Sequence, residues 1–137
     1  MKSTLTDKQK RRLQILESQL ELAVSNRDYT TAKSLVLDIQ TELQSPGHYI
    51  RLIKAKNKLY ELAIELKDFE FAINGLFFNR HVLSDKTRIY LETNTLLAIC
   101  FIRMLEIEKA KAFIKEVLMN DGKPGNWHKT DSGFYHC

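Results

Sequence analysis

The chain has 137 residues, a formal net charge of +4, 44% hydrophobic and 28% charged residues, which suits one ordinary globular domain. Two cysteines are too few for a disulfide framework. No apolar run approaches the ~20 residues of a membrane span, and the N-terminal segment has no apolar signal core. We therefore expect a cytoplasmic protein. Because there are only two prolines and five glycines, long stretches lack helix breakers, which predicts an all-α fold.

The first predicted hairpin covers about residues 6–44. Thr6 followed by Gln9 is a capping-box pattern, and apolar residues at helical spacing continue to about Asn26. Asp28 is a good N-cap for the next helix, since its carboxylate can accept hydrogen bonds from free backbone N–H groups. The segment SPGH at 45–48 then interrupts the pattern.

Two more predicted hairpins follow, at about 49–81 and 85–119. The third helix runs over about 49–66, and Asp68 caps the fourth. Ser84 or Asp85 is expected to start the fifth, and the sixth ends at the turn-rich segment 120–126. The six helices thus form three pairs within residues 1–119, followed by a tail at 120–137.

A ten-residue pattern recurs at the start of the second helix in each pair. The copies are RDYTTAKSLV (27–36), KDFEFAINGL (67–76) and, more loosely, LEIEKAKAFI (105–114). Each copy places a small alanine where two helices would cross, namely Ala32, Ala72 and Ala110. One hairpin cannot bury its own apolar face, so repeated hairpins are expected to stack on each other.

This pattern resembles the tetratricopeptide repeat family over about residues 10–119. The motif positions of the first helices match Leu20 and Ala23, Tyr60 and Ala63, and Ala98 and Phe101. The copies are 40 and 38 residues apart instead of the family's 34. The family's Gly before the helix-opening Asp is absent, and the pairs Asn26–Arg27, Leu66–Lys67 and Met104–Leu105 stand there. The resemblance implies a degenerate, right-handed array of three stacked antiparallel hairpins.

The resemblance also implies a function in binding. In the family, the first helices line a concave groove for a protein or peptide. The matching positions here are Gln14, Glu17, Glu21 and Ser25, then Lys54, Asn57, Glu61 and Glu65, then Glu92, Thr95, Ile99 and Arg103. Glu17 and Glu21 occupy places where some members hold a C-terminal carboxylate with Lys and Asn. Two glutamates would repel such a group, so a basic or mixed ligand is favoured.

The alternative function is nucleic-acid binding. Arg51, Lys54 and Lys58 form one basic stripe of the third predicted helix, and phosphate contacts need such charge. A second basic cluster, at residues 8–12, opens the first helix. Most aromatic residues, however, fall at predicted core positions rather than at positions open for base stacking.

No motif in the sequence indicates an enzyme, a metal site or a bound cofactor. His-Glu-x-x-His, a Gly-rich phosphate loop and a nucleophile elbow are all missing. The tail offers His128, Asp131, His136 and Cys137, but their spacing fits no established zinc finger. Cys100 lies in an apolar run and is expected to be a buried thiol.

We therefore predict a non-enzymatic protein- or peptide-binding module, acting as an adaptor or an accessory subunit of a larger assembly. The aromatic tail, with Trp127, Phe134 and Tyr135, is expected to cover the apolar face of the last hairpin in the same chain or in the second copy of a homodimer.

Overall fold

The computed structural model describes residues 5–44, 46–83 and 87–122, and in these ranges it contains helices and no strand. The elements are α1 (Asp7–Ser25), α2 (Tyr29–Glu42), the short 3-10 helix η1 (Pro46–His48), α3 (Tyr49–Glu65), α4 (Phe69–Val82), α5 (Arg88–Arg103) and α6 (Ile107–Gly122). The all-α prediction is confirmed. The chain forms two compact units that divide between Leu66 and Lys67.

Capping chemistry sets the start of the first two helices as the sequence predicts. The Thr6 hydroxyl accepts a hydrogen bond from the Gln9 backbone N–H at 3.0 Å, and the Gln9 side chain accepts one from the Thr6 N–H at 2.9 Å. This is a complete capping box. The Asp28 carboxylate accepts from the Thr31 N–H at 3.2 Å.

Two further helix starts are less simple. Asp68 is the N-cap residue of α4, as predicted, but its side chain makes no capping hydrogen bond. α5 begins at Arg88, and the Thr87 hydroxyl supplies its cap by accepting a hydrogen bond from the Tyr90 N–H at 3.2 Å. Ser84 and Asp85, the predicted starting residues, lie outside the described residues.

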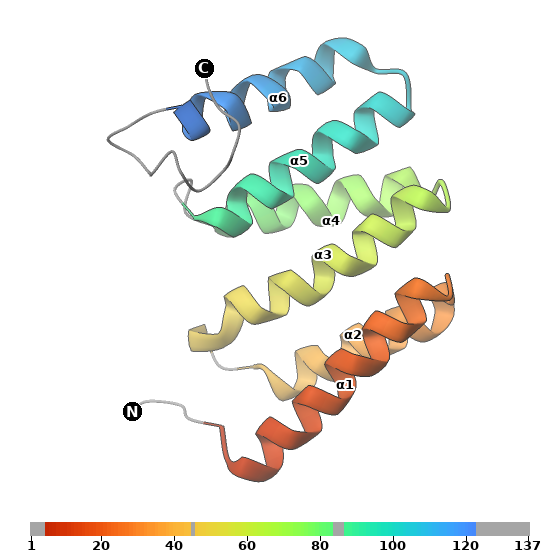
Figure 1. Cartoon of the computed structure of the whole chain (residues 1–137), viewed down its shortest axis with the longest axis vertical. Coiled ribbons are helices and arrows are strands. Elements are labelled where there is room, and N and C mark those ends of the chain that lie inside the picture. The colour runs from red at the N-terminus through yellow and green to blue at the C-terminus, as the bar shows by residue number, and fades with distance from the viewer. Residues whose placement is uncertain (1–4, 45, 84–86, 123–137) are drawn as a thin grey trace. The chain divides into compact units, whose positions relative to one another are not determined.

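The first unit is built from α1, α2 and α3. α1 and α2 form an antiparallel hairpin, and α3 packs against both of them (Figure 1). The interior is formed mainly by leucine, isoleucine and alanine side chains at helical spacing, among them Leu13, Leu16, Leu20, Ala32, Leu35 and Ile39.

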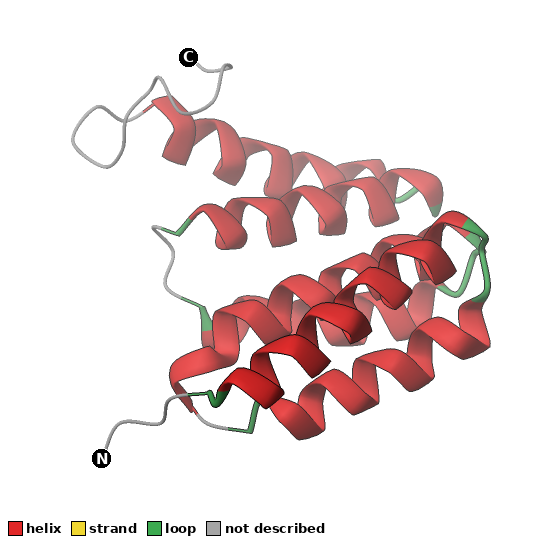
Figure 2. Cartoon of the chain, turned by 60° about the horizontal axis from the view of Figure 1, so that its bottom comes forward, coloured by secondary structure: helices red, strands yellow, loops and turns green. Residues whose placement is uncertain are grey.

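In the second unit, α5 lies between α4 and α6 and packs against both (Figure 1). The described part of the chain consists of helices joined by loops and turns (Figure 2). Three rings, one from each helix, meet in this unit. Phe101 stacks on Phe113 with centroids 5.6 Å apart, and Phe77 meets Phe113 edge-on at 5.7 Å. Such contacts stabilise beyond the area they bury. Cys100 is fully buried on α5, as expected from its apolar surroundings.

The repeated pattern marks equivalent places in the fold. The three crossing alanines, Ala32, Ala72 and Ala110, are at most 1% exposed. All six motif positions of the first helices, Leu20, Ala23, Tyr60, Ala63, Ala98 and Phe101, are also buried. The last apolar position of the repeated pattern differs between the copies. Ile114 on α6 is 39% exposed, whereas the corresponding residues Val36 and Leu76 are buried.

In each pair that stands in place of the family's glycine, the second residue has a glycine-like backbone. Arg27, Lys67 and Leu105 have φ of 57°, 69° and 65°, and they are the non-glycine residues with positive φ in the described chain. At the first turn the Asp28 N–H bonds to the Ala23 carbonyl at 2.8 Å. At the third, the Glu106 N–H bonds to the Phe101 carbonyl at 2.7 Å. These six-to-one bonds end α1 and α5 in the same helix-terminating motif.

The predicted division of the chain into three hairpins and a tail stays a prediction. The consecutive helices α1 and α2 pack against each other, as do α5 and α6, and α6 continues to Gly122, past the predicted end at 119. The helices of the predicted middle hairpin, 49–81, belong to different units. Stacking of the three hairpins into one array remains a prediction. Of the predicted tail, residues 123–137 lie outside the described residues.

Candidate functional site: a charged cavity between two helices

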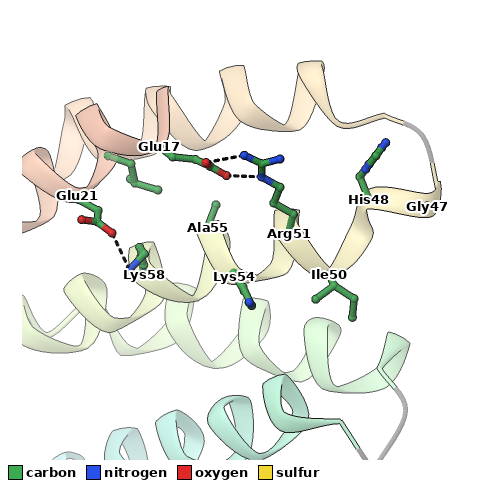
Figure 3. A pocket seen from close by; sticks show the side chains of 10 residues that line it. Glu17, Glu21, Gly47, His48, Ile50, Arg51, Lys54, Ala55 and Lys58 are labelled. Carbon is green, nitrogen blue, oxygen red and sulfur yellow. Dashed lines mark hydrogen bonds and ion pairs between the residues drawn. The ribbon is translucent and has the colours of Figure 1, made fainter. Parts of the chain in front are cut away.

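A cavity of about 550 Å³ lies between α1 and α3 in the first unit. Its apolar part is formed by Leu20, Ala55 and Ile50, of which the first two are buried. Charged side chains form the rest, and they come from both helices (Figure 3): Glu17, Glu21, Arg51, Lys54 and Lys58. The cavity therefore offers an apolar base and a rim of both charge signs.

One rim contact is a bidentate ion pair. The Arg51 Nε donates to Glu17 Oε2 at 2.7 Å, and Arg51 Nη2 donates to Glu17 Oε1 at 2.8 Å. This fork geometry is the strongest form of a guanidinium–carboxylate contact. Because the guanidinium donates hydrogen bonds to the Glu17 carboxylate, the pKa of Arg51 is raised, and Arg51 is a permanent cation. Both side chains are about one-third exposed, which leaves them within reach of a ligand.

The second rim contact is looser. Lys58 Nζ lies 3.5 Å from Glu21 Oε2, and the two side chains are 47% and 67% exposed. Exposed pairs of this kind contribute little to stability and are easily exchanged for other partners. Lys54 is exposed and makes no ion pair with any described residue (Figure 3). Glu21, Lys54 and Lys58 are thus the charges most available to a ligand.

One end of the cavity is open and polar. A Cβ atom added at Gly47 would meet no atom within 4 Å. His48 is the N-cap residue of α3, and its side chain makes no capping hydrogen bond. Its buried Nε2 has no hydrogen-bond partner among the described residues. Gly47, His48 and Ile50 line this site although the sequence analysis did not assign them to it, since the break at 45–48 indicated only a turn.

The cavity brings together residues that the sequence analysis placed in two different sites. Glu17, Glu21 and Lys54 were predicted for the peptide groove, whereas Arg51, Lys54 and Lys58 were predicted for nucleic acid. In the structure the two glutamates pair with Arg51 and Lys58. The sequence did contain an indication of this pairing, because the acidic residues of one predicted helix and the basic residues of another have complementary charges.

The other predicted groove residues lie elsewhere. Gln14 and Ser25 on α1 and Glu61 and Glu65 on α3 are exposed but do not line the cavity. Asn57 is only 2% exposed, so its side chain is not presented to solvent. Glu92, Thr95, Ile99 and Arg103 are exposed on α5, in the second unit.

A second polar cluster joins the three helices of the second unit. Arg80 of α4 donates to Asn94 Oδ1 at 2.7 Å and to Glu116 Oε1 at 2.6 Å. The Tyr90 hydroxyl donates to Glu116 Oε2 at 2.5 Å. Burial and the Glu116 contact raise the pKa of Tyr90, so its phenol stays protonated. The Arg80 guanidinium and the Tyr90 hydroxyl both meet acceptors within the unit, which is typical of a structural network, whereas the buried Asn94 Nδ2 has no hydrogen-bond partner among the described residues.

Comparison with known proteins gave no relatives. No protein-family model, curated protein or solved structure matches this chain. The tetratricopeptide-like resemblance therefore rests on the residues described above.

Potential metal ligands are not clustered in the described part of the chain. Within residues 5–44, 46–83 and 87–122, no three His, Cys, Asp or Glu side chains are grouped so that they could hold a metal ion. His128, Asp131, His136 and Cys137 lie outside these ranges. None of the helices described has the length and apolar character needed to cross a membrane.

Proposed function

We propose that this chain is a non-enzymatic protein- or peptide-binding module, an adaptor or accessory subunit with a tetratricopeptide-like arrangement of hairpins. The observation that carries the proposal is the α1–α3 cavity, whose buried leucine and alanine are surrounded by carboxylates and cations. Concave sites with an apolar base and a few placed charges are suited to side-chain recognition.

The chemistry of the ionisable groups supports binding over catalysis. Arg51, with its raised pKa, is a fixed charge and cannot exchange a proton near neutral pH. Burial raises the pKa of Cys100 to about 11, so its thiol is not ionised as a nucleophile would need to be. A rim of fixed and paired charges sets orientation and specificity for a partner.

The pairing in the cavity also refines the expected ligand. Both oxygens of Glu17 already accept hydrogen bonds from Arg51, so Glu17 repels an acidic group less than an unpaired carboxylate would. Lys54 and Glu21 remain the accessible charges of opposite sign. We expect a peptide that carries an acidic and a basic side chain, which is one of the two alternatives, a basic or a mixed ligand, that the sequence favoured.

Nucleic-acid binding is the second candidate, carried by the stripe of Arg51, Lys54 and Lys58. Two of these three cations already have carboxylate partners at 2.7 and 3.5 Å. A phosphate would have to compete with those carboxylates, which favours the peptide over the nucleic acid.

The experiment is a selection of peptides from a random displayed library on the full chain, followed by calorimetric titration of a selected peptide. Lys54→Glu should weaken binding about tenfold or more, because it reverses the accessible cation. Glu17→Lys with Glu21→Lys should weaken it as well. Lys115→Glu, the same charge change at an exposed position of α6, is the control and should bind as wild type.

Two results would contradict the proposal. The first is equal affinity of the Lys54→Glu and Lys115→Glu variants, which would place the site elsewhere. The second is salt-sensitive binding of a single-stranded RNA or DNA oligonucleotide that disappears when Arg51, Lys54 and Lys58 are changed to Glu. That outcome would establish the nucleic-acid candidate instead.

A further inference from the structure

One face of α1 combines two cations with two exposed apolar side chains. Lys8, Arg11, Ile15 and Leu22 follow one another at spacings of three, four and seven residues, which places them on one side of a helix. Ile15 and Leu22 are 56% and 62% exposed, and the two cations are exposed as well. We call these four residues the α1 outer face, because the buried residues of the helix follow a different stripe.

The α1 outer face is cationic. From Lys8 to the end of α1, the acidic residues are Glu17 and Glu21, and both line the α1–α3 cavity, where they pair with cations of α3. Within the described part of the chain, neither Lys8 nor Arg11 takes part in an ion pair. Positive charges in the first two turns of a helix also oppose its dipole, so these cations weaken α1 rather than stabilise it. Charge complementarity therefore favours an acidic partner.

We propose that the α1 outer face binds an acidic, amphipathic helix of a partner protein. Apolar residues seven apart are the spacing at which two helices contact each other repeatedly along their length. The partner places apolar side chains on Ile15 and Leu22 and carboxylates beside Lys8 and Arg11. The face is about 21 Å long, which a helix of about 14 residues covers. This interaction goes beyond the peptide site of the cavity, and it lets the chain hold two partners at once.

The charges favour an antiparallel arrangement of the two helices. Lys8 and Arg11 lie at the N-terminal end of α1, and Ile15 and Leu22 lie towards its C-terminal end. An antiparallel partner brings its own C-terminal end, which is the negative end of its dipole, beside the two cations. Its apolar residues then precede its acidic residues in sequence. The contacts with Leu22, Ile15, Arg11 and Lys8 fall at about positions i, i+7, i+11 and i+14 of the partner.

Two other anionic partners fit this face less well. A nucleic acid would contact the cations through its phosphates and leave Ile15 and Leu22 uncovered. A helix that lies on an anionic membrane has a continuous apolar side and a polar face rich in cations. On α1 the cations and the apolar residues instead follow one another along the axis, and the polar residues Ser18 and Gln19 lie between Ile15 and Leu22.

The test starts from a displayed library of helical peptides of about 20 residues. The library fixes leucine at i and i+7 and glutamate at i+11 and i+14 and randomises the other positions. The strongest binder selected on the full chain is the probe, and glutamine in place of its two fixed glutamates should weaken binding at least about tenfold. A library with the four fixed residues in reverse order is the control, and it should yield no binder that depends on Lys8 and Arg11.

Charge variants of the chain locate the site of the probe. Lys8→Glu/Arg11→Glu should weaken binding at least about tenfold. This variant keeps its fold, because acidic residues suit the first turns of a helix. Lys111→Glu/Lys115→Glu makes the same change of net charge at exposed positions of α6 and should bind as wild type.

Apolar variants test the second half of the contact. Ile15→Ser/Leu22→Ser should weaken binding of the probe about tenfold or more, because it removes both apolar contacts. The matched control is Ile107→Ser/Ile114→Ser on α6, a pair that is 46% and 39% exposed and also seven apart. The control should bind as wild type, and circular dichroism should show the same helix content in both variants.

Three results would overturn the proposal. The first is a library that yields no binder. The second is equal affinity of Lys8→Glu/Arg11→Glu and Lys54→Glu, since Lys54→Glu alters only the cavity and should bind the probe as wild type. The third is binding of phosphatidylserine-containing vesicles, or of a single-stranded oligonucleotide, that is lost in Lys8→Glu/Arg11→Glu while no peptide binds. Because Lys54→Glu separates the two sites, this proposal and the peptide site of the cavity can fail independently.

Discussion

Replacing Leu105 with glycine should stabilise the protein, although it deletes a large apolar side chain. Leu105 ends the α5–α6 turn with φ of 65°, in the left-handed region that favours glycine. Its side chain is 83% exposed, so the fold gains little from burying it. The substitution therefore removes backbone strain at almost no loss of packing.

The expected gain follows from two opposing effects. A left-handed conformation costs an L-residue about 1–2 kcal/mol, which glycine does not have to overcome. Glycine has more freedom in the unfolded chain, which costs about 0.5–1 kcal/mol on folding. The net stabilisation of Leu105→Gly is about 0.5–1 kcal/mol. With a urea dependence of about 2 kcal/mol/M, the unfolding midpoint should rise by about 0.3–0.5 M.

Urea unfolding followed by circular dichroism measures this shift. Lys115→Gly, at an exposed interior position of α6, should lower the midpoint, because glycine weakens a helix interior by about 1 kcal/mol. Leu105→Ala keeps the strained backbone and should show no gain. If Leu105→Gly lowers the midpoint as Lys115→Gly does, the left-handed turn is not present in the protein.

Three further changes address the packing and the buried groups. Ala32→Leu should destabilise by about 1–3 kcal/mol because Ala32 is fully buried, whereas Ala112→Leu on the exposed side of α6 should be neutral in the same unfolding assay. Glu116→Ala should lower the free energy of unfolding by about 1–3 kcal/mol, because it removes the acceptor of two part-buried hydrogen bonds. A variant as stable as the wild type would rule out the polar cluster. In a Cys137→Ser background, Cys100 should react with a thiol reagent only as fast as the protein unfolds, and labelling at the rate of a free thiol would contradict its burial.

The parts of the fold that depend on local chemistry were predictable. Thr6 and Asp28 start helices because their side-chain oxygens are near the first free N–H groups, and that geometry is set by a few neighbouring residues. The start of α5 was not predictable, because residues 84–87 contain three capping residue types. Thr87 makes the observed cap.

Contacts between distant residues could not be predicted. Arg80 and Glu116 are 36 residues apart, and nothing in their local sequences indicates the pair. The contacts that form the cavity could not be predicted either. Helical spacing grouped the acids of α1 and the bases of α3 correctly, but only the packing of α3 against α1 reveals that Glu17 and Arg51 meet.

The central claim is that the α1–α3 cavity binds a peptide, and the most direct test is a titration of the isotopically labelled full chain by nuclear magnetic resonance. With a peptide selected on the wild type, the largest backbone amide shifts should fall in residues 17–21 and 47–58, which hold the cavity-lining side chains. Lys54→Glu should abolish those shifts at the same peptide concentration. Shifts confined to residues outside these two segments, or shifts at Arg51 and Lys58 produced by an oligonucleotide and not by any peptide, would contradict the claim.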